Sequence, residues 1–226
     1  TGVKIDKEKY GLKPVYDGRL LIKVLNLSVW SMLHAFISVA PWFLFFVAIE
    51  HLGKTELAIS NITRSVSAIF FVIANSFAVT TSSLVSNAIG ARARNELFPI
   101  CHKVLKLGYA VGIPFVVVAL LCNRWIVSFY TDNELLIELA FAPFVVMLLN
   151  YTFALPGYVY LNAVGGTGKT KITFLFQVTT TCVYLVYLYW LSFCIKASLS
   201  LYLTAEYLFV ILLALQSIIH LKSKHY

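Results

Sequence analysis

Charged side chains are scarce in this sequence. Of its 226 residues only 12% are Asp, Glu, Lys or Arg, whereas 60% are hydrophobic and the mean hydropathy is +0.83. Soluble domains carry roughly 25% charged residues, because a water-facing surface requires them. The composition therefore excludes an ordinary soluble protein and predicts an integral membrane protein whose apolar surface faces lipid.

Metal-binding patterns and clustered charge are also missing. The four cysteines lie far apart without C-x-x-C spacing, and the histidines show no ligand spacing, so neither a metal site nor a disulfide framework is expected. The net charge of +8 is spread between apolar runs and forms no single basic patch. Nucleic acid is therefore not an expected partner, and no cofactor is expected.

No catalytic set can be recognised either. The serines have no histidine partner at a recognisable spacing. The paired carboxylates Glu134 and Glu138 lie in an outer loop, where they are expected to begin a helix. The sequence therefore predicts that the protein is not an enzyme.

Long uncharged stretches dominate the sequence instead. A helix needs about 20 mainly apolar residues to cross a bilayer, and only the third stretch depends on flanking basic side chains that snorkel. Helices are expected because an open sheet edge cannot be satisfied in lipid. The sequence thus predicts an all-α integral membrane bundle of six transmembrane helices, over residues 24–49, 65–91, 107–123, 139–164, 172–195 and 197–221.

Basic residues predict which loops face the cytoplasm, since cytoplasmic loops are enriched in Lys and Arg. If the N-terminus is inside, fourteen of the 18 basic residues fall at inner loops. Only Lys54, Arg124 and Lys196 then fall at outer loops. We therefore expect a multi-pass protein of the cell (cytoplasmic) membrane with both termini of this chain cytoplasmic.

The stretch GGTGKT at residues 165–170 is similar to a nucleotide-binding loop, G-x-x-x-x-G-K-[ST]. Gly168, Lys169 and Thr170 fit, but Ala163 stands where the first glycine is required. The stretch also lies in a short connection between two spans, with no room for the strand that precedes such a loop. We interpret it as a turn whose glycines allow positive φ, and expect no ATP.

Prolines and small residues lie within the spans. Proline removes a backbone hydrogen bond inside a helix, so helix hinges are expected at such positions. Small residues repeated every four positions, at Ser82, Ser86 and Gly90 and at Gly108 and Gly112, are typical of close helix packing. The expected hinges are Pro41, Pro114, Pro156 and Gly157.

Two charges lie within spans, each about two helical turns from the outer end. A charge at such a position costs at least ~2.5 kcal/mol unless it has a partner, a water-filled cavity or a route to the interface. For Arg64 a function is favoured, and for Glu206 a function and a position just below the interface are both open. Glu206 is the only acidic residue within a span and is therefore the candidate protonation site.

Polar residues within spans predict a substrate pathway. The second span is the most polar and should not face lipid along its whole length. The fourth span carries an Asn-Tyr pair just before Pro156-Gly157, and unwound polar segments near the membrane centre are typical of transporter sites. The candidate pathway residues are Arg64, Asn75, Asn150 and Tyr151.

The order of these features resembles the C-terminal lobe of the multidrug and toxic compound extrusion (MATE) family. A basic entry loop, a proline-containing span with FFVAIEHLGKTELAISNITRS, a polar span ending LVSNAIGARARNE, and YLNAVGGTGKTKITF carry the resemblance over essentially the whole chain. The family has twelve helices in two six-helix lobes. The resemblance implies that residues 1–19 are a cytoplasmic entry loop from a missing N-terminal lobe and that residues 20–226 are the six-helix C-terminal lobe.

The resemblance implies an antiporter for multidrug efflux. Such a protein moves small organic, often cationic, xenobiotic compounds across the bilayer by alternating access, driven by a proton or sodium gradient. Where many members carry a Glu and an Asp, this chain has Ser38 and approximately Ala154. At the glycine turn, usually R-G-x-G-D-T, it has Gly165 and Lys169 in place of the Arg and Asp. An acidic sodium site in this lobe is therefore not expected, and coupling is expected to depend mainly on the missing lobe.

Two alternatives stay open. One is a flippase of the same superfamily that moves a lipid-linked oligosaccharide, for which Arg64 beside a polar span would suit an anionic headgroup. The other is a membrane scaffold that transports nothing.

Overall fold

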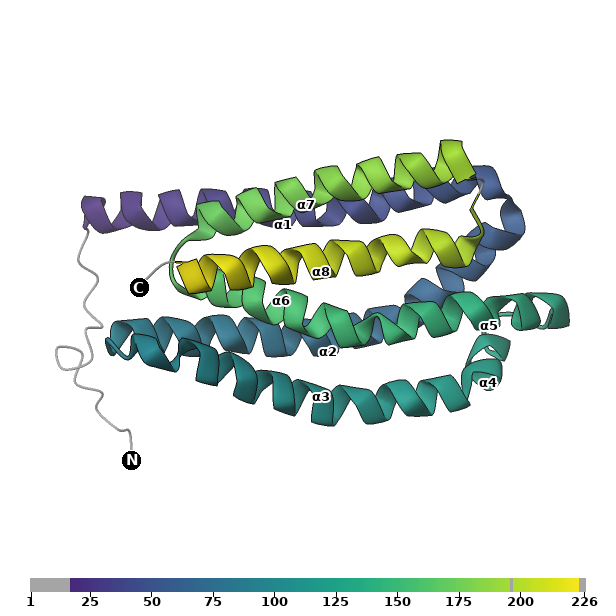
Figure 1. Ribbon diagram of the computed structural model, residues 1–226, viewed down its shortest axis with the longest axis horizontal. Coiled ribbons are helices and arrows are strands. Elements are labelled where there is room, and N and C mark those ends of the chain that lie inside the picture. The colour runs from purple at the N-terminus through teal and green to yellow at the C-terminus, as the bar shows by residue number, and fades with distance from the viewer. Residues whose placement is uncertain (1–16, 196, 224–226) are drawn as a thin grey trace, which may run out of the picture.

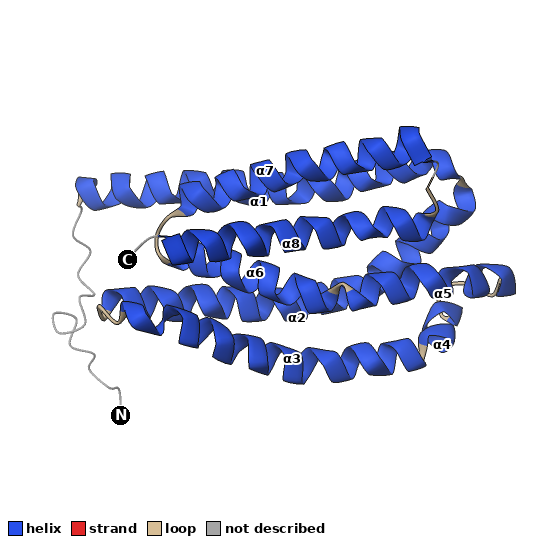
Figure 2. Cartoon of the chain, in the orientation of Figure 1, coloured by secondary structure: helices blue, strands red, loops and turns tan. Residues whose placement is uncertain are grey.

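The computed structural model describes residues 17–195 and 197–223, and within these ranges the chain contains helices and no strand (Figure 2). Six helical segments are long and apolar enough to cross a membrane, which confirms the prediction of an all-α bundle with six spans. They are Gly18–Leu52, Lys54–Gly90, Arg94–Leu121, Glu134–Gly166, Thr170–Phe193 and Leu199–Ser223.

The spans are built from α-helices, some of which have a short helical turn of another type at one end. Short 3₁₀ turns at Glu50–Leu52 and Arg94–Glu96 flank the second span, and a π-helical turn at Leu191–Ile195 ends the fifth. The α-helices are α1 (Gly18–Ile49), α2 (Lys54–Gly90), α3 (Leu97–Leu121), α4 (Asn123–Ser128), α5 (Glu134–Leu149), α6 (Tyr151–Gly166), α7 (Thr170–Trp190) and α8 (Leu199–Ser223).

The long helices lie side by side along one axis (Figure 1). α1 packs mainly on α7, α8 lies between α7 and α6, and α2 packs on both α6 and α3. α1 and α2 follow each other in the chain but have few backbone contacts with each other. α1 begins and α8 ends at the same end of the bundle (Figure 1).

Several boundaries differ from those expected; α2, for example, begins at Lys54, eleven residues before the expected start of the second span. The third span begins at Leu97, ten residues earlier than expected, because exposed Lys103 and Lys106 continue the helix beyond its apolar part. The helix is therefore long enough to cross a membrane, and snorkelling of the basic side chains that flank its apolar part remains a prediction. The fourth span is two helices separated at Asn150. α1 begins at Gly18, within the segment expected to be entry loop, while residues 1–16 of that segment lie outside the described ranges.

Small residues allow the close contacts that the sequence predicts. A Cβ atom added at Gly166 would lie 2.5 Å from the Ser82 carbonyl oxygen, and the Ser86 hydroxyl donates to the Gly166 carbonyl at 2.8 Å. A Cβ at Gly112 would overlap the Tyr151 ring. The contacts of α2 and α3 with α6 thus depend on the absence of side-chain atoms, whereas Gly90 has nothing within 4 Å.

The GGTGKT stretch is a helix connection. α6 ends at Gly166 and α7 begins at Thr170. Gly168 has a φ of +81°, as a turn glycine requires, but Gly165 and Gly166 are helical. The expectation of positive φ is therefore wrong for these two, because they complete the last turn of α6.

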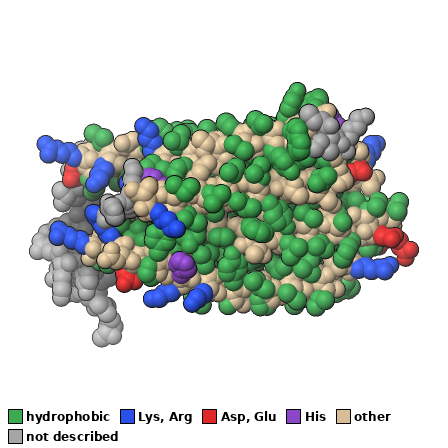
Figure 3. All heavy atoms as spheres, viewed as in Figure 1, with side chains coloured by type: hydrophobic (Ala, Val, Ile, Leu, Met, Phe, Trp, Pro, Cys, Tyr) green, Lys and Arg blue, Asp and Glu red, His purple; other side chains and the backbone are tan. Residues whose placement is uncertain are grey.

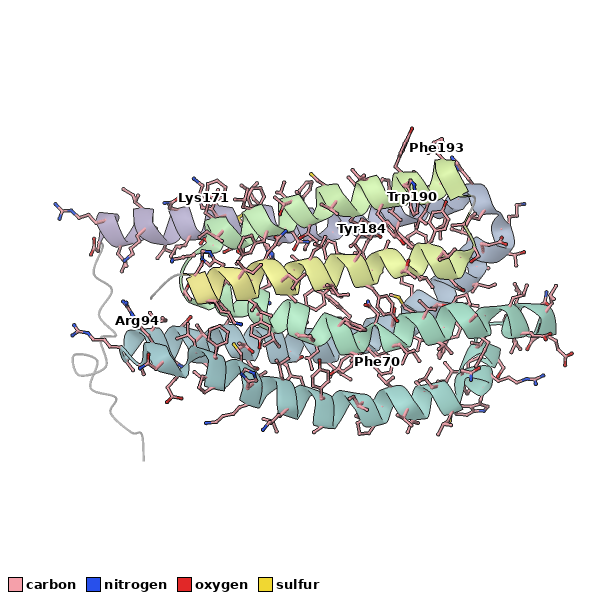
Figure 4. All side chains as sticks on the ribbon, viewed as in Figure 1. Phe70, Arg94, Lys171, Tyr184, Trp190 and Phe193 are labelled. Carbon is pink, nitrogen blue, oxygen red and sulfur yellow. The ribbon has the colours of Figure 1, made fainter. Side chains whose placement is uncertain are left out.

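The two ends of the bundle differ in charge. Apolar side chains cover its middle, and Lys and Arg gather at the end where α1 begins (Figure 3). Arg94 and Lys171 lie toward this end, whereas Trp190 and Phe193 lie toward the other (Figure 4). The cytoplasmic location of the basic end remains a prediction from the charge bias.

Candidate functional site: a buried polar chamber

Two adjoining cavities lie within the bundle, among α1, α2, α5, α6 and α8. The first has a volume of about 40 Å³ and the second of about 10 Å³. Trp42, Met147 and Glu206 line both, so the cavities meet at these side chains. We call the two together the polar chamber.

Glu206 is the acidic group of the chamber. It lies seven residues after the start of α8, roughly 10 Å along the helix from its N-terminal end at 1.5 Å per residue. The hydroxyl of fully buried Tyr184 on α7 donates to its Oε1 at 3.2 Å. Arg64 on α2 lines the second cavity with it and attracts it electrostatically. Glu206 therefore has both a hydrogen-bond donor and a cation beside it.

Arg64 is held by the aromatic side chains of α1. Its guanidinium carbon lies 3.6 Å from the ring centroid of Trp42 and 4.4 Å from that of Phe46. One guanidinium nitrogen donates to the Trp42 carbonyl at 3.5 Å. Cation–π contacts of this kind strengthen when the cation is partly desolvated. Arg64 thus links α1 to α2 while its charge faces Glu206.

Three buried oxygen atoms in the chamber wall have no hydrogen-bond partner among the described residues. They belong to Ser60 and Thr63 on α2, in the second cavity, and to Asn150, in the first. Buried polar atoms are nearly always satisfied by protein or ordered water. The chamber wall therefore offers several acceptor positions to a small polar ligand such as water.

Tyrosines stabilise the break between α5 and α6. Pro156 has no N–H to donate to the Thr152 carbonyl, and the Tyr109 hydroxyl donates to that carbonyl at 2.7 Å instead. The Tyr207 hydroxyl donates to the Val146 carbonyl, one turn before Asn150. Tyr109 thus replaces the backbone donor that Pro156 lacks, whereas the Val146 carbonyl also keeps the backbone N–H of Asn150 at 3.3 Å.

The structure brings together four of the five polar residues selected from the sequence. Arg64, Asn150, Tyr151 and Glu206 all line the chamber. Asn75 does not: its side chain is exposed on α2, on the face directed away from the bundle.

The expected hinge positions lie in continuous helices. Pro41 is buried within α1, and Pro114 is exposed within α3, which curves along its length (Figure 1). Pro156 and Gly157 lie within α6, and a Cβ at Gly157 would lie 2.7 Å from the Val210 carbonyl oxygen. The interruption of the fourth span is therefore at Asn150 and not at Pro156, and the hinge role of these four residues remains a prediction.

Several chamber residues were not selected from the sequence. Tyr184 lies in the interior of the bundle (Figure 4), and Trp42 and Tyr158 line the first cavity. Aromatic residues are too common in this sequence to be distinguished without contacts. Ser60 and Ser67 could have been found, because they lie four residues before and three after Arg64 and so share its helix face.

The exposed face of α2 carries polar side chains at intervals along its length, with Ile69, Val72 and Val79 exposed among them. Such a face is costly against lipid and is expected to contact protein or water. Beyond the first turn of the helix, its exposed polar residues are Asn61, Ser65, Asn75, Ser76, Thr80, Ser83, Ser86 and Asn87.

Metal ligation has little support in the described ranges. No group of three or more His, Cys, Asp or Glu side chains there could hold an ion. Cys101, Cys122 and Cys182 are free thiols, and the side chain of Cys194 lies outside the described residues.

Comparison with known proteins extends this description. The family model MatE matches residues 31–191. No curated protein sequence matches the chain.

Solved structures share the fold. A structure described as MATE in the bent conformation is 19% identical, with a TM-score of 0.76 over 87% of this chain and 44% of that one. An inward-facing multidrug resistance MATE family transporter of the MOP superfamily is 19% identical, with a TM-score of 0.73 over 83% and 43%. An outward-facing one is 18% identical, with a TM-score of 0.72 over 87% and 43%. The chain therefore spans less than half the length of the structures it matches.

Proposed function

The chain belongs to the MATE family of transporters, and we propose that it is the C-terminal lobe of a secondary active exporter that works by alternating access. The observation that carries this proposal is the likeness to both transport states. The same lobe matches an inward-facing structure with a TM-score of 0.73 and an outward-facing one with 0.72. Equal likeness to both supports a lobe that moves as a unit against a second lobe.

The exposed polar face of α2 supports a substrate pathway between the lobes. Asn75 lies near the middle of α2 on this face. Repeated polar side chains on an exposed helix face are unfavourable in lipid but suit a water-filled path. We propose that this face, with Asn75, contacts the substrate, and that Asn150, Tyr151 and Arg64 support it from the chamber behind.

Small organic, often cationic, compounds are the proposed cargo, exported across the cytoplasmic membrane. The flippase alternative requires Arg64 to bind an anionic headgroup. Its guanidinium is instead held between Trp42 and Phe46 and faces Glu206, which favours export of organic compounds.

Coupling to a proton or sodium gradient is proposed to involve this lobe only in part. Ser38 and Ala154 offer no carboxylate, and Glu206 is the acidic residue of the chamber. We therefore propose that an acidic residue of the other lobe contributes most of the coupling and that Glu206 contributes the rest.

Gradient-driven efflux from vesicles that contain the intact protein tests the function. Efflux of a cationic organic dye is expected when a gradient is imposed and should stop when the gradient is dissipated. Glu206→Gln should reduce the rate without abolishing it. Headgroup flipping without dye efflux would instead support the flippase, and neither activity would support the scaffold.

A further inference from the structure

The chamber has the size and lining of a site for water. The side chains of Ser60, Thr63 and Asn150 are 1%, 2% and 7% exposed, and each carries an oxygen atom without a partner among the described residues. A water molecule requires about 10–15 Å³ and two to four polar contacts. The first cavity, at about 40 Å³, has room for more than one water, and the second, at about 10 Å³, for one at most.

The charges around Glu206 favour a proton over a metal cation. Arg64 faces the carboxylate from α2, Tyr184 from α7 and Tyr158 from α6, and the lining residues from α1 and α5 are not titratable. A sodium ion would remain a separate cation close to Arg64 and would require several oxygen ligands. A proton adds the same charge but bonds to one carboxylate oxygen, and the remaining positive charge stays on Arg64, over the rings of Trp42 and Phe46.

A row of aromatic rings separates the chamber from the polar face of α2. Phe71 makes edge-to-face contacts with Trp42 at 6.0 Å and with Tyr158 at 5.5 Å between ring centroids. All three rings line the first cavity. Phe71 is also 38% exposed, and Asn75 follows it by one helical turn. Phe71 therefore has one side toward the chamber and one toward the exposed surface.

We infer that the polar chamber is a hydrated proton-binding site in which Glu206 accepts the proton, and that Phe71, between Trp42 and Tyr158, closes this site from the polar face of α2. Ser60, Thr63 and Asn150 hold the waters. A hydronium ion among these waters transfers its proton to a carboxylate oxygen of Glu206 and becomes water. The inference rests on the proposed function for its role in transport, but proton binding can be measured without transport.

Labelling with a water-soluble carbodiimide tests both parts, because this reagent reacts with protonated carboxyl groups. Peptide mass spectrometry on the intact, purified protein should find label on Glu206 that decreases from mildly acidic to mildly alkaline pH. Phe71→Ala should increase the labelling rate of Glu206 several-fold. Phe115→Ala, which removes an exposed ring on α3 that lines neither cavity, should leave the rate unchanged. Exposed Glu134 serves as the internal reference.

The result that overturns proton binding is Glu206 labelling that is absent or independent of pH in both wild type and Phe71→Ala. Equal rates in wild type and Phe71→Ala overturn the closing role of Phe71. Phe71→Leu repeats the comparison with a smaller loss of volume if the alanine variant does not fold. Normal pH-dependent labelling in a protein that transports nothing would contradict the proposed function alone. Transport without such labelling would contradict this inference alone.

Discussion

The substitution Gly166→Ala adds one methyl group and tests a close contact between α6 and α2. Its added Cβ would lie 2.5 Å from the Ser82 carbonyl oxygen, which belongs to a helix backbone and cannot move aside alone. Overpacking of this kind costs about 1–3 kcal/mol. We expect Gly166→Ala to lower the melting temperature of the intact protein in detergent.

Gly90→Ala is the matched control, because a Cβ there meets nothing within 4 Å. Both glycines lie at the end of a helix and neither has a positive φ. Gly90→Ala should therefore be neutral or stabilise by up to about 1 kcal/mol, since alanine favours helix. Equal melting temperatures for the two variants would contradict the packing argument.

The charge pair between α2 and α8 predicts non-additive effects. Arg64→Gln leaves the Glu206 carboxylate without its cation, and Glu206→Gln leaves Arg64 without its anion. The double variant removes both charges and should be less destabilised than the sum of the single variants, with a coupling of about 0.5–3 kcal/mol. Thermal unfolding at alkaline pH, where the carboxylate is ionised, measures this coupling.

The control experiment combines Arg19→Gln with Glu206→Gln in the same way. Arg19 is suitable because it is exposed in the first turn of α1. Its effect should add to that of Glu206→Gln. A strictly additive result for Arg64 as well would mean that the two charges are not coupled.

The sequence predicts individual candidate site residues where the local sequence around them makes them unusual. Arg64 and Glu206 stand out because charge inside an apolar stretch is rare and costly. Their proximity was not predictable, because it depends on which face of α2 meets which face of α8. Asn75 shows the same limit: its polarity is visible in the sequence, but its position on the exposed face of α2 depends on the packing of α2 against α6 and α3.

At the scale of elements, Pro156 in α6 leaves a backbone carbonyl without its usual donor, and a tyrosine of α3 supplies the hydrogen bond instead. Tyr109→Phe removes the donor to the Thr152 carbonyl, which Pro156 cannot supply. The loss should cost about 1 kcal/mol, because one carbonyl within a membrane span is left unsatisfied. In a Pro156→Ala background alanine offers an N–H to the same carbonyl, so Tyr109→Phe should then cost less. Melting temperatures of the four proteins measure the difference.

Tyr189→Phe is the control, since this ring is 64% exposed. It should have no measurable effect in either background. A Tyr109→Phe cost that Pro156→Ala leaves unchanged would mean that the hydroxyl does not replace the missing backbone bond.

The sequence predicts that the six helical spans exist, but it does not predict where a span is interrupted. The six spans follow from length and hydropathy, which are local properties. A hinge was expected at Pro156-Gly157 and remains a prediction, whereas the α-helix itself is interrupted at Asn150, between α5 and α6. The third span was expected to be short because Lys103 and Lys106 are charged, although a helix readily extends beyond the hydrocarbon with basic residues on it.

At the scale of the whole molecule, the charge difference between the two ends predicts topology. Single cysteines at Thr55, Asp132 and Ser198 should react with a membrane-impermeant thiol reagent from outside intact cells, whereas one at Asn95 should not. All four positions are exposed, so accessibility differs only by side of the membrane. Ser198 is chosen over its neighbour Ala197, which is 4% exposed. Labelling at Asn95 in intact cells would reverse the assigned orientation.

The family could be identified from the sequence because its turns have specific spacing, and the match to residues 31–191 confirms that identification. The transported compound, the coupling ion and the site residues could not be identified from the sequence in the same way. They depend on side chains that meet across helices and on a surface of α2 that is exposed in this chain.

The position of Trp42 makes the chamber visible to optical spectroscopy. Among the four tryptophans, only Trp42 lines the chamber, and its indole lies 3.6 Å from the guanidinium carbon of Arg64. Indole fluorescence responds to a nearby charge and to water. With Trp30, Trp125 and Trp190 replaced by phenylalanine, the emission of Trp42 becomes a native reporter, so hydration and charge beside Glu206 can be followed in real time without an attached dye.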